Sequence, residues 1–117
     1  MRRVTREMGY VIEGVELETD ADGFLLEPNF SDEAPSVIAA AEGVTLTDAH
    51  LAVIDFMREK YREDGQTPNF RHMLKEFAER VRPGTDSKYL YDLFPTGPAK
   101  QAAKIAGLPK PYGKAGY

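Results

Sequence analysis

The stretch Phe70-Arg-His-Met-Leu-Lys-Glu-Phe-Ala-Glu-Arg-Val81 decides the fold class of this 117-residue chain. Its large apolar side chains recur at positions i, i+3, i+4, i+7 and i+11, which predicts an amphipathic helix with one face in the core. A core position is far more common for such a stripe than a cofactor pocket. Pro83 and Gly84 end the helix. The predicted core stripe comprises Phe70, Met73, Leu74, Phe77 and Val81.

Two further helices are predicted upstream of this one. Thr47 has the residue type of an N-cap and is followed by an acidic first turn, so a helix is expected from there to Gly65. Ser31-Asp-Glu33 begins an earlier helix in the same way, and Gly43 ends it. The chain therefore contains a series of short helices joined by brief turns.

The N-terminal part has the pattern of a β-hairpin. Residues 11–17 alternate between apolar and polar in the way a half-buried strand does. Asp20-Ala-Asp-Gly23 supplies the turn residues, and Phe24-Leu-Leu26 forms a short return strand. Residues 1–9 are expected to be a mobile N-terminal arm.

Downstream of the third helix, Ser87 begins a short helical segment and Pro98 begins a last helix, Ala99 to Ala106. The two prolines of Leu108-Pro-Lys-Pro111 force extended backbone, so residues 108–117 are expected to form an extended C-terminal arm. Together these elements predict a single domain, residues 1–117, of the α+β class but mostly α. It is a small helical bundle of about five helices with an N-terminal β-hairpin and an extended C-terminal arm.

Composition excludes several classes of protein. The chain contains no cysteine, which excludes disulfides and thiol catalysis and fits a reducing cytoplasm. No apolar run approaches the ~20 residues that a membrane span needs. A soluble, cytoplasmic protein is therefore expected.

The charge is distributed unevenly. Asp92 is the last acidic residue, and the four lysines beyond it leave residues 1–92 with a net charge of −8 in a chain of net charge −4. A cationic tail on an acidic body is typical of a tail that meets an acidic partner surface or a nucleic acid. A solvated, mobile terminus is the alternative.

No self-contained active site is evident. His50 and His72 are the chain's two histidines, and neither stands at a known metal-ligand spacing. Glycine-rich phosphate loops are absent, and the carboxylates fall in helix first turns or on polar faces. The sequence predicts no catalytic residue, no cofactor and no metal site.

A helix-turn-helix is an alternative interpretation. Helices 48–63 and 69–82, joined by a turn that contains glycine, have this pattern. A recognition helix would then expose Arg71, His72, Lys75 and Arg80 for DNA binding. The acidic residues of the same helix and the acidic body weigh against this alternative.

Six segments, in this order and spacing, resemble the DsrC/TusE family of small sulfur-carrier proteins over about residues 10–114. The resemblance implies the helical bundle, the hairpin and a flexible C-terminal arm. The segments are Gly43-Val-Thr-Leu-Thr-Asp-Ala-His50, Val53-Ile-Asp-Phe-Met-Arg-Glu-Lys-Tyr61, Pro68-Asn-Phe-Arg-His-Met-Leu-Lys75, Ser87-Lys-Tyr-Leu-Tyr-Asp-Leu-Phe-Pro95, Gly97-Pro-Ala-Lys-Gln-Ala102 and Lys104-Ile-Ala-Gly-Leu-Pro-Lys-Pro111.

The resemblance also implies which positions should carry sulfur. Family members have a cysteine near the C-terminus, which aligns with Lys114, and the DsrC branch has a second one, which aligns with Ala103. In the DsrC branch the arm reaches into the active-site channel of dissimilatory sulfite reductase. In the TusE branch the arm accepts persulfide sulfur in the relay toward tRNA 2-thiouridine. A persulfide needs a thiolate, so the substituted positions cannot carry one.

The resemblance therefore implies a regulatory rather than a catalytic member of the family. The first hypothesis is a protein that binds a sulfite reductase or sulfurtransferase partner through its cationic arm. The second is a DNA-binding regulator. The residues predicted to form the partner-binding arm are Lys100, Lys104, Lys110, Pro111, Tyr112, Gly113 and Lys114.

Overall fold

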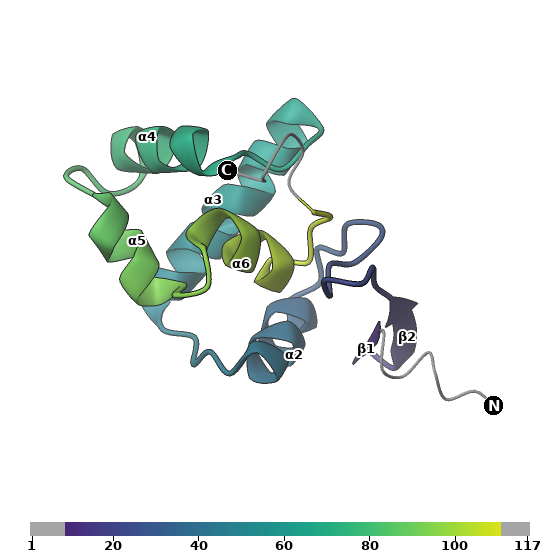
Figure 1. Cartoon of the computed structure of the whole chain (residues 1–117). Coiled ribbons are helices and arrows are strands. Elements are labelled where there is room, and N and C mark those ends of the chain that lie inside the picture. Colours follow the sequence, from purple (N-terminus) through teal and green to yellow (C-terminus); the bar gives the residue numbers. More distant parts are fainter. Residues whose placement is uncertain (1–8, 111–117) are drawn as a thin grey trace.

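The computed structural model describes residues 9–110. Within that range the chain forms a two-stranded hairpin followed by five helices (Figure 1). The predicted N-terminal arm lies outside the described residues except for Gly9, and so do residues 111–117 of the predicted C-terminal arm. The elements are β1 Gly9–Ile12, β2 Val15–Glu18, α2 Glu33–Glu42, α3 Asp48–Asp64, α4 Phe70–Arg80, α5 Ser87–Leu93 and α6 Pro98–Ile105.

Helix α4 forms where its apolar stripe predicts it. Its N-cap is Asn69, whose side chain accepts a hydrogen bond from the backbone of His72 at 3.0 Å. Met73 and Phe77 are fully buried, and the Phe77 ring meets that of Phe56 on α3 edge to face, with ring centroids 5.5 Å apart. The stripe therefore supplies part of the core.

The prediction that Val81 is a core residue is wrong. The helix ends at Arg80, and Val81, at the C-cap position, is 44% exposed. Val81 lies just beyond the last helical residue, so it does not share the buried face of Phe77. The apolar spacing in the sequence therefore predicts a helix that is one residue too long.

The hairpin exists, but its turn is not the predicted one. β1 pairs with β2 in antiparallel register, with Ile12 opposite Val15. The two residues between them, Glu13 and Gly14, have φ angles of 53° and 79°, as a type I′ turn requires. Asp20 to Gly23 forms a second turn, which closes an isolated bridge between Thr19 and Leu25. The apolar–polar alternation of residues 11–17 predicts one continuous strand, whereas Gly14 lies in a turn that divides this segment into two strands.

The long helix α3 is fixed at its start by His50. The backbone N–H of Thr47 donates to His50 Nδ1 at 3.1 Å, and the His50 N–H donates to the Thr47 hydroxyl at 3.4 Å, which forms a capping box. His50 Nε2 bonds the carbonyl of Leu93 at 2.9 Å, so this nitrogen carries the proton. His50 therefore ties α3 to the end of α5.

Helix α6 lies across α3 and also contacts α2, α4 and α5 (Figure 1). Its alanines, among them Ala99, Ala102 and Ala103, are buried and allow its backbone to approach its neighbours closely. The predicted fold class, a mostly helical bundle of about five helices with an N-terminal hairpin, is confirmed. No helix among residues 9–110 combines the length and apolarity needed to cross a membrane.

The buried ring of Phe77 gives a first testable prediction. Phe77→Ala should lower the free energy of unfolding by ~3–5 kcal/mol, because it leaves a cavity between α3 and α4. Val81→Ala, one turn further along and exposed, is the matched control and should change stability by no more than about 0.5 kcal/mol. Urea denaturation midpoints measure both. Equal losses for the two variants would contradict this packing.

Candidate functional site

The C-terminal arm leaves the body through residues 106–110, here called the arm root. Helix α6 ends in a Schellman motif: the N–H of Gly107 donates to the carbonyl of Lys104 at 3.1 Å, and that of Leu108 to the carbonyl of Ala103 at 3.0 Å. Leu108 is fully buried. Residues 108–110 lie beyond the end of α6, where the extended arm was predicted to begin, but Leu108 itself packs in the core.

Arg58 of α3 holds the arm root against the loop before α2. Its Nε donates to the carbonyl of Ala106 at 2.8 Å. Its Nη1 donates to the carbonyl of Phe30 at 3.2 Å, and its Nη2 to those of Asn29 at 3.2 Å and Ser31 at 2.9 Å. Burial lowers the pKa of Arg58 from its ordinary value. Four carbonyl groups thus satisfy a buried guanidinium.

Arg58 was not predicted as a site residue, although the sequence contains a signal for it. It follows Met57 and lies four residues after Ile54, both fully buried. A cation on the apolar face of a helix indicates a buried charge that needs partners. The identity of those partners depends on the packing of distant segments.

Gly107 approaches the loop before α2 closely. Its carbonyl accepts a hydrogen bond from the N–H of Asn29 at 2.8 Å. Its φ angle is 80°, and a Cβ at this position would overlap the carbonyl oxygen of Asn29. Both the backbone conformation and the close approach therefore require glycine here.

Two side chains hold the last described residues of the arm root. The hydroxyl of Thr67, a buried residue of the α3–α4 loop, donates to the carbonyl of Pro109 at 3.1 Å. Lys110 forms an ion pair with Asp22 of the second N-terminal turn. The hydrogen bond from Lys110 lowers the pKa of Asp22 and raises that of Lys110. The arm root is thus fixed between the loop and the turn.

A groove of about 600 Å³ opens beside the arm root. It is lined by apolar residues from three segments and by polar groups at its edge. Its lining residues are Asp20, Leu25, Leu26, Tyr61, Gly65, Gln66, Thr67, Pro109 and Lys110.

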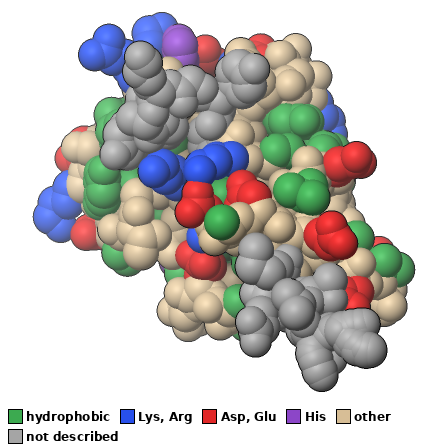
Figure 2. All heavy atoms as spheres, turned by 45° about the vertical axis from the view of Figure 1, so that its right-hand side comes forward, with side chains coloured by type: hydrophobic (Ala, Val, Ile, Leu, Met, Phe, Trp, Pro, Cys, Tyr) green, Lys and Arg blue, Asp and Glu red, His purple; other side chains and the backbone are tan. Residues whose placement is uncertain are grey.

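The structure brings three of the predicted arm lysines together. Lys100, Lys104 and Lys110 line one cavity of about 280 Å³ with Asp22. Lys104 forms an ion pair with Glu42 at 3.2 Å. Lys104 and Lys110, both predicted residues of the partner-binding arm, are thus each paired with a carboxylate of the same chain. Figure 2 shows basic side chains gathered beside acidic ones on this side of the molecule.

The remaining predicted arm residues, Pro111, Tyr112, Gly113 and Lys114, lie outside the described residues.

Ala103, the other position that aligns with a family cysteine, is fully buried in α6. Its methyl group is part of the core, so this position faces the body of the domain and not the solvent.

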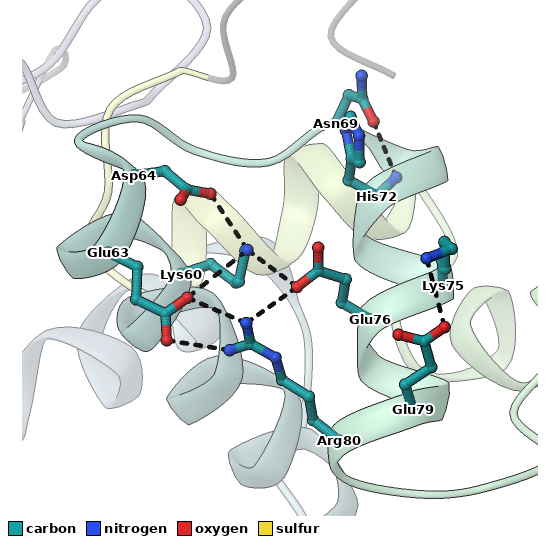
Figure 3. Close-up of polar contacts among 9 residues, drawn as sticks. All are labelled: Lys60, Glu63, Asp64, Asn69, His72, Lys75, Glu76, Glu79 and Arg80. Carbon is teal, nitrogen blue, oxygen red and sulfur yellow. Dashed lines mark hydrogen bonds and ion pairs between the residues drawn. The ribbon is translucent and has the colours of Figure 1, made fainter.

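On α4, the helix that the DNA-binding alternative requires, acidic side chains neutralise part of the basic charge. Arg80 of α4 pairs with Glu63 at 3.0 Å and with Glu76 at 3.1 Å (Figure 3). The nearly buried Lys60 pairs with Glu76 at 2.9 Å and with Asp64 at 3.2 Å. Hydrogen bonds from Arg80 and Lys60 lower the pKa values of Glu63 and Glu76, respectively. This network fastens α4 to α3 and occupies the Arg80 side chain.

The other candidate DNA-binding residues of α4, Arg71, His72 and Lys75, are exposed. Lys75 pairs with Glu79 at 3.3 Å. Glu76 and Glu79 thus separate the basic residues at the start of α4 from Arg80, so the helix has no continuous cationic surface. Across residues 9–110, no three His, Asp or Glu side chains are close enough together to hold a metal ion.

Comparison with known proteins gives a consistent result. The family model described as "DsrC like protein" matches residues 11–114. The chain is 49% identical over 104 residues to a protein of Haemophilus influenzae named "Sulfurtransferase TusE homolog", covering 86% of this chain and 94% of that protein. It is 46% identical over 103 residues to Escherichia coli "Sulfurtransferase TusE", with the same two coverages.

Solved structures show the same fold. The DsrC of Allochromatium vinosum superposes with a TM-score of 0.77 at 38% identity, covering 92% of this chain and 98% of that chain. The DsrC of Archaeoglobus fulgidus, described as the oxidized gamma-subunit of the dissimilatory sulfite reductase, gives a TM-score of 0.77 at 34% identity, covering 92% and 99%.

The close approach of Gly107 to Asn29 gives a second prediction. Gly43 ends α2 with a φ angle of 75° and open space around it, so Gly43→Ala measures the backbone strain alone, about 1 kcal/mol. Gly107→Ala adds an overlap with backbone and should lower the free energy of unfolding by at least about 1 kcal/mol more. Thermal or urea unfolding compares the two variants. Equal losses would show that the contact with Asn29 does not constrain this position.

Proposed function

This chain belongs to the DsrC/TusE family, and we propose that it is a non-catalytic member, which binds a sulfur-metabolism partner through its C-terminal arm in a regulatory role. One observation carries the proposal: the arm root is intact, while the chain contains no cysteine. The scaffold that presents the arm is kept, and the group that would carry sulfur is missing.

The chemistry of sulfur transfer supports a non-catalytic role. A sulfur carrier uses a thiolate, which attacks the outer sulfur of a donor persulfide; the donor's S–S bond breaks, the donor leaves as a thiolate, and the carrier becomes the persulfide. Lys114 offers an amine and Ala103 a methyl group at the two family positions. The curated relatives are named sulfurtransferases, but this chain has no residue that can perform their reaction by a thiol. In the proposed role, this chain is therefore not an enzyme and needs no cofactor.

The relatives indicate the class of partner. One structural neighbour is described as the gamma-subunit of the dissimilatory sulfite reductase, and the sequence relatives are sulfurtransferases. We propose that a cytoplasmic partner of either type binds this chain through residues 110–114, supported by Lys100 and Lys104 of α6. A chain that occupies the same partner site without carrying sulfur competes with the cysteine-bearing carrier, which is the basis of the regulatory role.

No specific observation favours the DNA-binding alternative. Its recognition helix would be α4, where Arg80 and Lys75 are paired with acidic side chains. Opening these pairs would leave carboxylates at a surface that has to meet phosphates.

The missing thiol predicts that the protein takes up no sulfur. After incubation with a persulfide donor and a sulfurtransferase, intact mass spectrometry should show an unchanged mass. Lys114→Cys is the matched variant, because it restores a thiol at the family position and should gain one sulfur atom that a reductant removes. A gain of one reductant-sensitive sulfur atom by the natural chain would contradict the proposed non-catalytic role.

The proposed docking role predicts that the end of the arm carries binding energy. A chain that ends at Lys110 keeps every described residue and should bind the partner about tenfold more weakly or worse, since it loses a lysine contact and two tyrosines. The binding partners to test are purified dissimilatory sulfite reductase and the sulfurtransferase that loads TusE. Lys75→Ala removes one exposed lysine elsewhere and is the control. If the truncated chain binds as tightly as the full one, the arm is not the docking element.

A further inference from the structure

We propose that the free edge of β2 binds an extended basic segment of a partner protein, which adds a third strand to the N-terminal hairpin. The site is a cavity of about 380 Å³ lined by residues 16–18 and 25–29, here called the β2 groove. The arm root contributes no lining residue to it. This inference therefore goes beyond the proposed function and does not depend on it.

The β2 groove follows the edge of β2 that faces away from β1. Glu16 and Glu18 lie on one face of the hairpin and Leu17 on the other, and all three line the groove, so it runs along the edge of the strand. No residue of β1 lines it. The opposite wall, residues 25–29, meets β2 near one end, through the bridge that joins Thr19 to its first residue. Between the two walls, the edge of β2 is open.

An open strand edge pairs readily with an extended segment. The antiparallel pairing of β1 with β2 uses the backbone groups of alternate residues, and the other backbone groups of β2 point away from β1. A third strand would use them and would strengthen a two-stranded sheet, which is marginally stable alone. Because backbone pairing accepts almost any sequence, the side chains that line the groove decide which segment binds.

The charged side chains that line the β2 groove are all acidic. Glu16, Glu18 and Glu27 are exposed, and none of them forms an ion pair with another residue of the described range 9–110. No lysine or arginine lines the groove, so its charge is not neutralised by its own walls. Basic side chains opposite Glu16 and Glu18 on an added strand would form cross-strand pairs of opposite charge, which stabilise a sheet.

The same glutamates disfavour the other occupants of a strand edge. A second copy of the chain that paired through β2 would place its own Glu16 and Glu18 against these two, and like charges that face each other across a sheet are destabilising. A nucleic acid would bring phosphates to carboxylates. The basic residues 1–8 of the chain itself enter the hairpin at Gly9, on the β1 side, so they would have to cross β2 to reach the groove.

The pleat of the sheet predicts the side-chain pattern of the partner segment. Residues opposite Glu16 and Glu18 lie on the face of these glutamates, and the residues between them lie on the face of Leu17. The apolar lining of the groove also includes Leu26, whose side chain is 56% exposed and loses contact with water when it is covered. We therefore expect a segment of about five residues in which basic and apolar side chains alternate.

The test uses the isotopically labelled full chain and the acetylated, amidated peptide Arg-Val-Arg-Val-Arg, with backbone amide shifts measured by NMR at low ionic strength. Binding should shift the amide signals of residues 15–19 and 25–29. The same peptide with each backbone nitrogen methylated keeps its charges but has no N–H to donate to β2, so it should bind at least about fivefold more weakly. Equal binding of the two peptides, or shifts confined to other elements, would overturn strand addition.

Glutamate variants test the charge complementarity. Glu16→Gln with Glu18→Gln should weaken peptide binding about three- to tenfold, because two cross-strand charge pairs are lost. Glu59→Gln with Glu79→Gln is the matched control, since both glutamates are exposed, lie on α3 and α4, and change the net charge equally. Equal losses for the two double variants would show that only net charge matters and would overturn the site. Amide spectra verify that each variant is folded.

Two further outcomes would assign the groove to a different occupant and overturn the proposal. The first is a chain that binds the peptide only after Arg2→Gln, Arg3→Gln and Arg6→Gln, which would place its own N-terminal residues in the groove. The second is a dimer in sedimentation that the peptide dissociates, which would place a second copy there. No sulfur-metabolism partner enters these experiments, so their failure leaves the arm-truncation test, and with it the proposed function, unaffected.

Discussion

The buried guanidinium of Arg58 is the interaction on which the geometry of the arm depends. A buried charge is tolerated only when its hydrogen-bonding groups find partners, and Arg58 finds them in four backbone carbonyls. Three belong to residues 29–31 and one to Ala106, so the loop before α2 and the end of α6 have to meet at this side chain. The contact of Gly107 with Asn29 follows from that meeting.

This constraint gives the arm a fixed origin. Leu108 is buried, the Pro109 carbonyl is bonded to Thr67, and Lys110 is paired with Asp22. A partner that binds the arm therefore meets it at a defined place on the body, beside the groove and beside the cavity lined by Lys100, Lys104 and Lys110. Losing the family cysteines removes the chemistry without removing this geometry, which is why the proposed role is one of binding and competition.

Ion pairs determine how much of the charge on this side of the domain is accessible. Lys104 is engaged with Glu42 at a half-buried position, whereas Lys110 and Asp22 form an exposed pair, which contributes little to stability. On α4, the pairing of Arg80 with two glutamates serves the packing of α4 on α3. The same residue types thus have different roles, which depend on burial and on the segments that lie opposite.

The sequence by itself determined the helices, the family and the missing sulfur chemistry, because caps, prolines, apolar spacing and residue identity are local properties. It predicted Phe77 as a core residue and a last helix over residues 99–106, which the structure places at Pro98–Ile105. Only the tertiary structure decided that the hairpin turns at Glu13 and Gly14, that Leu108 belongs to the core, and that the arm lysines are paired. The partners of Lys104, Lys110 and Arg58 lie far away along the chain, and a local pattern carries no information about which distant segments pack together.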